Sequence, residues 1–206
     1  MLNINSIVER LKNREPESME EINHCAILIP LVKIDGEWEI IFELRSKNMS
    51  TQPGEVSFPG GKMETNESYK ETAVRETVEE LNIPKESIDI LGELDYLRSY
   101  TNLEIHCFLG TISGISVDNI SPNPGEVDHI FTVPLKYFLE TEPEGYYMDV
   151  ENTYNAEFPY NLIPGGKDYK FRKLRRTIYF YQYNDYVIWG YTATMIKHLI
   201  EIIKDL

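Results

Sequence analysis

Apolar positions along the chain fall into short runs separated by turn residues, a pattern typical of a mixed α/β protein. Two such runs, Ala26 to Ile34 and Trp38 to Leu44, flank Asp35-Gly36, and this arrangement predicts a β-hairpin with a tight turn. Runs rich in β-branched and aromatic residues predict further strands. These strands are expected at Ile88 to Leu97, Leu103 to Thr111, Val127 to Val133, Ile178 to Tyr183 and Tyr186 to Ile188.

Other segments carry apolar residues at the spacing of a helix. We expect helices at Asn5 to Leu11, around Ala73 to Leu81, in a short segment starting at Pro134, and at Tyr191 to Ile203. Proline suits the first turn of a helix because the amide hydrogen that it lacks would have no partner there. Strands and helices in this order predict an α/β fold, a mixed sheet with helices on both faces.

Length and composition narrow the class of protein. A chain of 206 residues suits one domain, residues 1–206, in which we expect residues 1–24 to form an N-terminal helix and a linker. No apolar run approaches the ~20 residues of a membrane span, and the N-terminus lacks the basic and apolar blocks of a secretory signal. Cys25 and Cys107 lie in apolar runs, which suits the reducing cytoplasm. The net charge of −14 argues against broad nucleic-acid binding.

A cluster of glutamates gives the clearest sign of chemistry. Glu76, Glu79 and Glu80 are three and four residues apart, so on a helix their carboxylates share one face. Carboxylate oxygens are the ligands that Mg²⁺ and Mn²⁺ prefer. The simpler alternative is a solvated acidic face, with Arg75 in an ordinary surface ion pair. In the functional interpretation, Arg75 orients a neighbouring carboxylate and the cluster holds a divalent cation.

The same helix lies in a longer pattern that begins at a glycine pair. Gly61 is followed after five residues by Glu67 and after seven more by Arg75-Glu76-Thr77-Val78-Glu79-Glu80-Leu81-Asn82-Ile83. This string resembles the Nudix box of the Nudix hydrolases, which cleave nucleoside diphosphates linked to another group. Thr77 stands where that family usually has an aliphatic residue, and Asn82 where it has glycine. Asparagine is the next best residue for the left-handed end of a helix.

The resemblance to the Nudix box implies both a fold and a set of site residues. It implies the Nudix α/β/α sandwich, whose loop–helix–loop holds Mg²⁺ or Mn²⁺. Glu76 and Glu80 are the first candidates for metal ligands, with Glu79 next and the Gly60 carbonyl as a backbone ligand. Glu67 is expected to support the start of the helix or to reach a further metal through water. Glu126, in the loop Ser121 to Val127, is a candidate for an extra ligand or the general base, the alternative being an ordinary exposed glutamate.

Two further fragments resemble the coenzyme A diphosphatase branch of the family. Arg45-Ser46 followed by the segment Gly54-Glu55-Val56-Ser57-Phe58-Pro59-Gly60-Gly61 is similar to that branch's signature, although Ser50 replaces its usual arginine. Ile188 to Ala193 is similar to the branch's opening of the last helix. Taken alone, these fragments could be a tight turn and a core tryptophan. The resemblance makes Arg45 and Ser46 candidates for substrate binding, and it leaves residues 142–176 as a probable insertion.

One local feature runs against the acidic character of the chain. Six basic residues crowd into ten positions, namely Lys167, Lys170, Arg172, Lys173, Arg175 and Arg176. Arginine suits bidentate contacts with phosphate, so Lys170, Arg172 and Arg175 are candidates for binding the 3′-phosphate of coenzyme A. The alternative is that these charges only balance acidic neighbours on a solvated loop.

The sequence therefore predicts a Mg²⁺- or Mn²⁺-dependent Nudix hydrolase in which Glu79, Glu80, Glu126 and Arg75 serve catalysis. The expected reaction splits coenzyme A or a derivative into 3′,5′-ADP and 4′-phosphopantetheine. Two alternatives stay open: a diphosphatase for ADP-ribose or a dinucleotide, and a non-catalytic nucleotide-binding regulator. The expected partner is a small-molecule nucleotide rather than nucleic acid or membrane, and a homodimer is an open alternative to a monomer.

Overall fold

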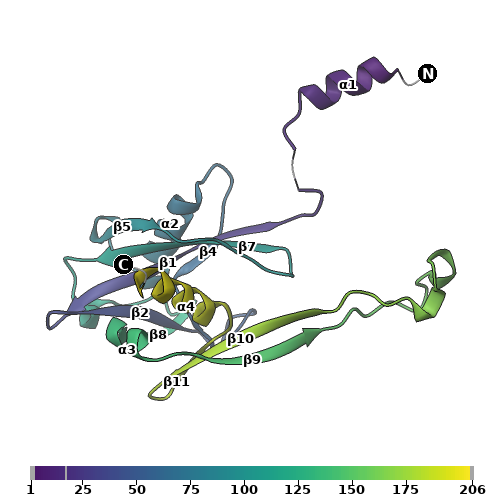
Figure 1. Ribbon diagram of the computed structural model, residues 1–206. Coiled ribbons are helices and arrows are strands. Elements are labelled where there is room, and N and C mark those ends of the chain that lie inside the picture. The colour runs from purple at the N-terminus through teal and green to yellow at the C-terminus, as the bar shows by residue number, and fades with distance from the viewer. Residues whose placement is uncertain (1–2, 17, 205–206) are drawn as a thin grey trace.

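The computed structural model describes residues 3–16 and 18–204, and Figure 1 shows a twisted central sheet with helices on its two faces. In chain order the helices are α1 (Ile4–Lys12), α2 (Tyr69–Leu81), α3 (Leu135–Glu140) and α4 (Gly190–Lys204). The strands are β1 (Asn23–Ile34), β2 (Glu37–Arg45), β3 (Val56–Ser57), β4 (Gly60–Lys62), β5 (Ile88–Glu93), β6 (Leu97–Arg98), β7 (Leu103–Ile112), β8 (Val127–Pro134), β9 (Glu144–Val150), β10 (Leu174–Tyr183) and β11 (Tyr186–Trp189). No helix in the described part of the chain is both long and apolar enough to cross a membrane.

Strand β1 organises the sheet, since it has neighbours along both edges. On one edge it runs parallel to β7, from Asn23 opposite Leu103 to Leu31 opposite Thr111. On the other edge, its end pairs with β2 and its beginning pairs with β4. The strands β1 and β2 diverge between these pairings, and the Pro59 carbonyl accepts a hydrogen bond from the Leu28 amide at 3.0 Å. This arrangement places the glycine pair at the centre of the sheet.

The two faces of the sheet carry different helices because side chains alternate along β1. On one face, Ala26 and Leu28 are fully buried and pack with Ala73 of α2. On the opposite face, Ile29 packs in a larger core with Phe138 of α3 and Ile196 of α4. These layers confirm the predicted α/β sandwich with a mixed sheet.

The ends of α2 are set by local chemistry. Ser68 and Glu71 form a capping box, in which each side chain accepts a hydrogen bond from the backbone of the other residue. At the other end, Asn82 adopts the left-handed conformation, with φ 53° and ψ 49°. Asn82 thus ends the helix as its place in the sequence pattern predicts.

The strand predicted at Ile88 to Leu97 is interrupted. Strand β5 ends at Glu93 after an irregularity in its pairing with β7 between Ile90 and Gly92. The short strand β6 then pairs with β7 again, with Leu97 opposite Ile105. The apolar pattern gives no sign of this break. Between the two strands, the Leu94 amide still donates a hydrogen bond to the Cys107 carbonyl at 2.8 Å.

The segment 142–176, expected as an insertion, contributes to a long two-stranded arm. Strand β9 pairs antiparallel with β10 from Leu174 opposite Val150 to Phe180 opposite Glu144, and β11 completes this second sheet. Strand β10 therefore starts at Leu174, earlier than the Ile178 that its apolar alternation predicts. Figure 1 shows the arm leading away from the central sheet to a tip of short helical turns. An aromatic cluster that includes Tyr154, Phe158 and Phe171 packs in this outer part.

Candidate active site

The glycine pair at the start of β4 allows this strand to lie directly against β1 and α2. A Cβ atom on Gly60 would lie 2.5 Å from the Ala26 carbonyl oxygen, and one on Gly61 would lie 2.5 Å from the carboxyl carbon of Glu76. Gly60 is held against backbone atoms and has φ 155°, so only glycine fits there. At Gly61 a Cβ would push the Glu76 carboxylate out of its place. The carboxylates of Glu76 and Glu80 consequently sit against the backbone of β4.

Glu80 is the most deeply buried of the predicted α2 ligands. Its side chain is 4% exposed, and its Oε2 accepts a hydrogen bond of 2.7 Å from the Gly60 amide. The pKa of Glu80 is raised to about 8, first by burial and then by the charges of Glu76 and Glu126, while the Gly60 N–H partly opposes this rise. This carboxyl group is thus held among other acids in a position that disfavours its charge.

Glu43 on β2 joins this cluster, although the sequence interpretation did not include it. It is 1% exposed, and its Oε1 has no hydrogen-bond partner among the described residues. Burial raises its pKa well above the ordinary value, and the charges of Glu80, Glu126 and Glu76 act in the same direction, opposed by Arg45. The signal was present in the sequence: an acid lies in an apolar strand, two residues before Arg45 and hence on the same face.

Arg75 holds the outer carboxylates in place. Its Nε and Nη2 donate to the two oxygens of Glu67 at 2.7 and 3.0 Å, and its Nη1 donates to Glu76 at 2.8 Å and to Glu79 at 3.1 Å. The paired guanidinium lowers the pKa of Glu67 to about 2. Burial raises the pKa of Glu76, although Arg75 opposes this. Glu79 is the most open of the set, with a side chain 53% exposed.

Glu126 approaches the cluster from the loop before β8. The Asn123 amide side chain donates to its Oε2 at 3.2 Å, and the Asn123 backbone N–H donates to the Glu80 carbonyl at 2.8 Å. The Ser46 amide in turn donates to the Glu126 carbonyl at 2.8 Å. This loop is therefore tied both to α2 and to the end of β2, and its carboxylate faces the same group of acids.

A cavity of about 390 Å³ opens beside the glycine pair. Arg45 lines it together with Gly60, Gly61, Tyr191 and other residues, and we refer to it as the catalytic cleft. The Arg45 Nε is buried and has no hydrogen-bond partner among the described residues. Ser46 is 5% exposed and does not line the cleft; its Oγ accepts a hydrogen bond of 3.4 Å from Asn48 in the following turn.

The predicted basic contacts are placed differently from one another. Lys170 and Arg172 are exposed in the outer part of the arm, and neither lines the catalytic cleft. Arg175 is exposed and makes two hydrogen bonds to Asp149, at 2.7 and 3.0 Å. The structure thus does not bring Lys170, Arg172 or Arg175 to the glycine pair. Lys170 and Arg172 precede β10 in the outer arm, and Arg175 is paired with Asp149 across the strands of the arm.

Arg176, the next residue, lies on the other face of β10 and meets the body of the protein. Its guanidinium carbon lies 5.1 Å from the ring centre of Tyr100 and 4.9 Å from that of Tyr191, and its Nη1 donates to the Tyr191 hydroxyl at 3.1 Å. These residues line a cavity of about 290 Å³, which shares Tyr191, Thr192, Gln52 and Glu55 with the catalytic cleft. We call this second space the Arg176 cavity.

The donor set suits a hard divalent cation. No three Asp, Glu, His or Cys side chains in residues 3–16 and 18–204 already point to one position as metal ligands. Nevertheless, Glu43 has an unpartnered buried oxygen, and the carboxylates of Glu43, Glu76 and Glu80 all have raised pKa values because of burial and mutual repulsion. A cation with oxygen ligands would relieve both conditions, so the residues present fit Mg²⁺ or Mn²⁺.

Comparisons with known proteins agree with the fold and identify the family. The family model of the NUDIX domain matches residues 23–151, and the chain therefore belongs to the Nudix hydrolase family, whose members act on phosphoanhydride bonds. The uncharacterized Nudix hydrolase NudL of Photorhabdus laumondii is 29% identical over 99% of this chain and 100% of its own length. The human mitochondrial coenzyme A diphosphatase NUDT8 is 26% identical over 87% of this chain and 69% of its own length. The chain thus resembles the coenzyme A diphosphatase branch.

A solved structure supports the same architecture. A MutT/nudix family protein from Enterococcus faecalis superposes with a TM-score of 0.52, covering 98% of this chain and 70% of that one, at 12% identity. At this identity the similarity concerns the fold alone.

Proposed function

We propose that this protein is a divalent-metal-dependent diphosphatase that hydrolyses coenzyme A or its derivatives to 3′,5′-ADP and 4′-phosphopantetheine. The observation that carries the proposal is the group of buried carboxylates against the glycine pair. The same two glycines line a cleft that shares residues with the cavity around Arg176 and its two tyrosines. The similarity to the human mitochondrial coenzyme A diphosphatase supports the choice of substrate.

In this proposal the carboxylates have distinct tasks. Glu76 and Glu80, with Glu79 and the Gly60 carbonyl, would hold the cation, and Glu43 adds a buried oxygen on the same side. When bound, the cation would neutralise the diphosphate oxygens and lower the pKa of the attacking water. Glu126, whose loop is tied to α2 and β2, would accept the proton from that water.

In this proposal two arginines serve the metal site in different ways. Arg75 positions the ligands, since it is hydrogen-bonded to Glu67, Glu76 and Glu79 at once. Arg45 lines the cleft, and its guanidinium would contact a phosphate oxygen there. Both roles need a planar guanidinium with several donors, which lysine does not supply.

We assign the nucleotide half of the substrate to the Arg176 cavity. Tyr100 is 48% exposed there and offers a ring for stacking on adenine, while Arg176 suits a 3′-phosphate. This assignment replaces the contacts expected from Lys170, Arg172 and Arg175, of which Arg175 is already paired with Asp149.

The test is product analysis by liquid chromatography with Mg²⁺ or Mn²⁺ and three substrates: coenzyme A, its 3′-dephospho form and ADP-ribose. We expect preference for coenzyme A and release of 3′,5′-ADP. Arg176→Ala should raise the KM for coenzyme A roughly tenfold, the size of one lost charged contact, and change the 3′-dephospho substrate much less. Arg175→Ala is the matched control and should retain the preference.

Two other results would redirect the assignment. Preference for ADP-ribose would replace the coenzyme A proposal with the alternative of a diphosphatase for ADP-ribose or a dinucleotide. Tight nucleotide binding without turnover by either metal would instead favour a regulator.

A further inference from the structure

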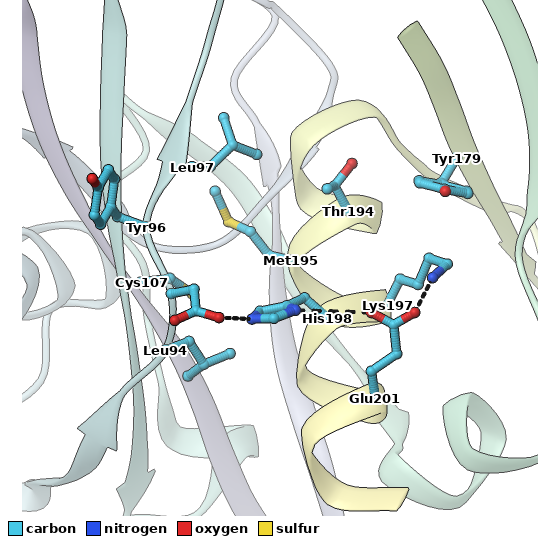
Figure 2. A pocket seen from close by; sticks show the side chains of 11 residues that line it. Leu94, Tyr96, Leu97, Cys107, Tyr179, Thr194, Met195, Lys197, His198 and Glu201 are labelled. Atoms are coloured by element: carbon cyan, nitrogen blue, oxygen red, sulfur yellow. Dashed lines mark hydrogen bonds and ion pairs between the residues drawn. The ribbon is translucent and has the colours of Figure 1, made fainter. Parts of the chain in front are cut away.

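The arm has an edge that no strand covers in the part of the chain that the structure describes. The second sheet has the order β11-β10-β9, so β9 is an edge strand, and no residue of β9 is buried. On the other side, β10 is anchored to the body of the protein, where Lys197 of α4 lies 5.4 Å from the ring centre of Tyr179. Figure 2 shows both side chains where β10 passes α4. The open backbone groups of the arm therefore lie along β9.

Most of the arm is a two-stranded ribbon. Strand β9 pairs with β10 from Leu174 to Phe180, whereas β11 pairs with β10 only from Phe180 to Tyr183. The two pairings thus overlap only at Phe180. A two-stranded ribbon is at best marginally stable in water, and further strands or a packing partner are needed to stabilise it. The open edge of β9 is the place where such a strand can add.

Strand β9 lacks the features that usually keep an edge strand from pairing with another chain. Such features are lysine, proline, a β-bulge or a very short length. Strand β9 has seven residues, Glu144–Val150, with no lysine or proline, and its pairing with β10 has no irregularity. Its one interior charge, Asp149, is paired with Arg175. By contrast, β5 at the edge of the central sheet has an irregular pairing of the kind that protects an edge.

The outer part of the arm differs in charge from the rest of the protein. Residues 151–176 contain six basic and three acidic residues, whereas the whole chain has a net charge of −14. Lys167, Lys170 and Arg172 are exposed there. Exposed acids stand at every second position where the chain enters β9 from the body, at Glu140, Glu142 and Glu144. The outer end of the arm is thus basic, and the body from which it extends is acidic.

We propose that β9 pairs antiparallel with β9 of a second copy of this chain, so that the protein is a two-fold symmetric dimer. Only a symmetry axis at Tyr147, the middle residue of β9, pairs all seven residues. It places Tyr147, which is 77% exposed, opposite the partner's Tyr147, and Tyr146 opposite the partner's Met148. Aromatic pairs and contacts between methionine and an aromatic ring both stabilise paired strands. Asp149 then lies opposite the partner's Gly145, so no like charges face each other.

The same pairing brings the opposite charges together. Because the strands are antiparallel, the partner's Val150 lies opposite Glu144, at the end of β9 that adjoins the body. The partner's outer arm continues from that point, so it extends toward the acidic body of the first copy, and the contact is reciprocal. The two second sheets become one continuous sheet. Met148, which lines the Arg176 cavity, is then held inside a sheet rather than at its edge.

The experiment measures the mass of the protein by light scattering after size-exclusion chromatography, and its dissociation constant by sedimentation equilibrium. We expect twice the chain mass of 24.0 kDa. Tyr147→Lys places like charges opposite each other at the symmetry axis and should raise the dissociation constant at least ~10-fold. Val187→Lys is the matched control, because Val187 is 46% exposed on β11, the other edge strand of the same sheet. This control should leave the dissociation constant unchanged.

A second pair of variants locates the axis. A residue at a two-fold axis lies opposite itself, so Tyr147→Cys should form a disulfide between the two copies when oxidised glutathione is added. Non-reducing electrophoresis should then show a band of two chains, whereas Val187→Cys should give none. Lys170→Glu combined with Arg172→Glu should weaken the dimer a few-fold, as expected for exposed ion pairs.

The outcomes separate this inference from the proposed function, on which it does not depend. A wild-type protein that stays monomeric at its highest soluble concentration would overturn the dimer, as would a dimer that Tyr147→Lys leaves unchanged. A ladder of larger species from Tyr147→Cys would also contradict it, because a two-fold contact closes at two copies. Coenzyme A turnover is measured in parallel, and its absence would overturn the proposed function alone.

Discussion

Replacement of Glu80 by glutamine should stabilise the metal-free protein at pH 8 and remove most of its turnover. The Glu80 carboxylate is 4% exposed and lies beside other acids, so its charge opposes folding when no cation is bound. Glutamine has nearly the same volume, and its amide oxygen can still accept the hydrogen bond from the Gly60 N–H. The variant therefore removes a charge and leaves the packing intact.

The size and sign of the effect follow from the pKa of Glu80, which rises from 4.5 to about 8 on folding. Between these values the folded protein binds more protons than the unfolded chain, so the free energy of unfolding falls as the pH rises from about 4.5 to about 8. At about 1.4 kcal/mol per pKa unit, the upper limit of the penalty is about 5 kcal/mol. Relaxation around the cluster reduces it, and we expect Glu80→Gln to gain about 2 kcal/mol at pH 8 and little at pH 4.5.

The assay is urea denaturation in the presence of a chelator at pH 4.5 and pH 8. Glu79→Gln serves as the matched control, because Glu79 is 53% exposed and paired with Arg75, so its replacement should bring no such gain. A Glu80→Gln protein that is equally or less stable than the wild type at pH 8 would refute the reasoning, as would near-full turnover in that variant.

Two further predictions concern backbone positions around α2. Asn82 is left-handed at φ 53°, a conformation that costs alanine more than glycine. Asn82→Ala should therefore lower the free energy of unfolding by about 1 kcal/mol in urea denaturation, whereas Asn82→Gly should change it by less than ~0.5 kcal/mol. Equal losses in both variants would contradict this explanation. Gly61→Ala should lower kcat by at least ~100-fold, because the new Cβ would displace the Glu76 carboxylate. Gly92→Ala is the control: Gly92 has open space around it, so this variant should leave kcat unchanged. A Gly61→Ala enzyme with normal steady-state kinetics would rule out this close approach.

Local signals in the sequence predicted the layered fold and the helix at the centre of the site. The spacing of Glu76, Glu79 and Glu80 and the asparagine at position 82 are properties of a single helix, and they need no knowledge of distant contacts. Glu43 was missed because its importance depends on the burial of β2 between two layers. A glutamate in an apolar strand could equally have pointed to solvent at an edge.

The basic segment illustrates the same limit in another way. Six charges in ten residues suggested phosphate binding, but the composition does not say which of them lie in β10 or on which of its faces Arg175 and Arg176 stand. The pairing of Arg175 with Asp149 of β9, and the placement of Arg176 between Tyr100 and Tyr191, depend on strand register and on a loop far away in the sequence. Alternation then gives neighbouring arginines different surroundings.

The most direct test of the account is Mn²⁺ binding, measured by electron paramagnetic resonance during titration of the purified protein. The account predicts bound Mn²⁺ in the wild type and much weaker binding in Glu80→Gln, with binding retained in Glu93→Gln, which changes a carboxylate outside the cluster. Equal Mn²⁺ binding by the wild type and Glu80→Gln would contradict the claim that the buried carboxylates at the glycine pair form the metal site.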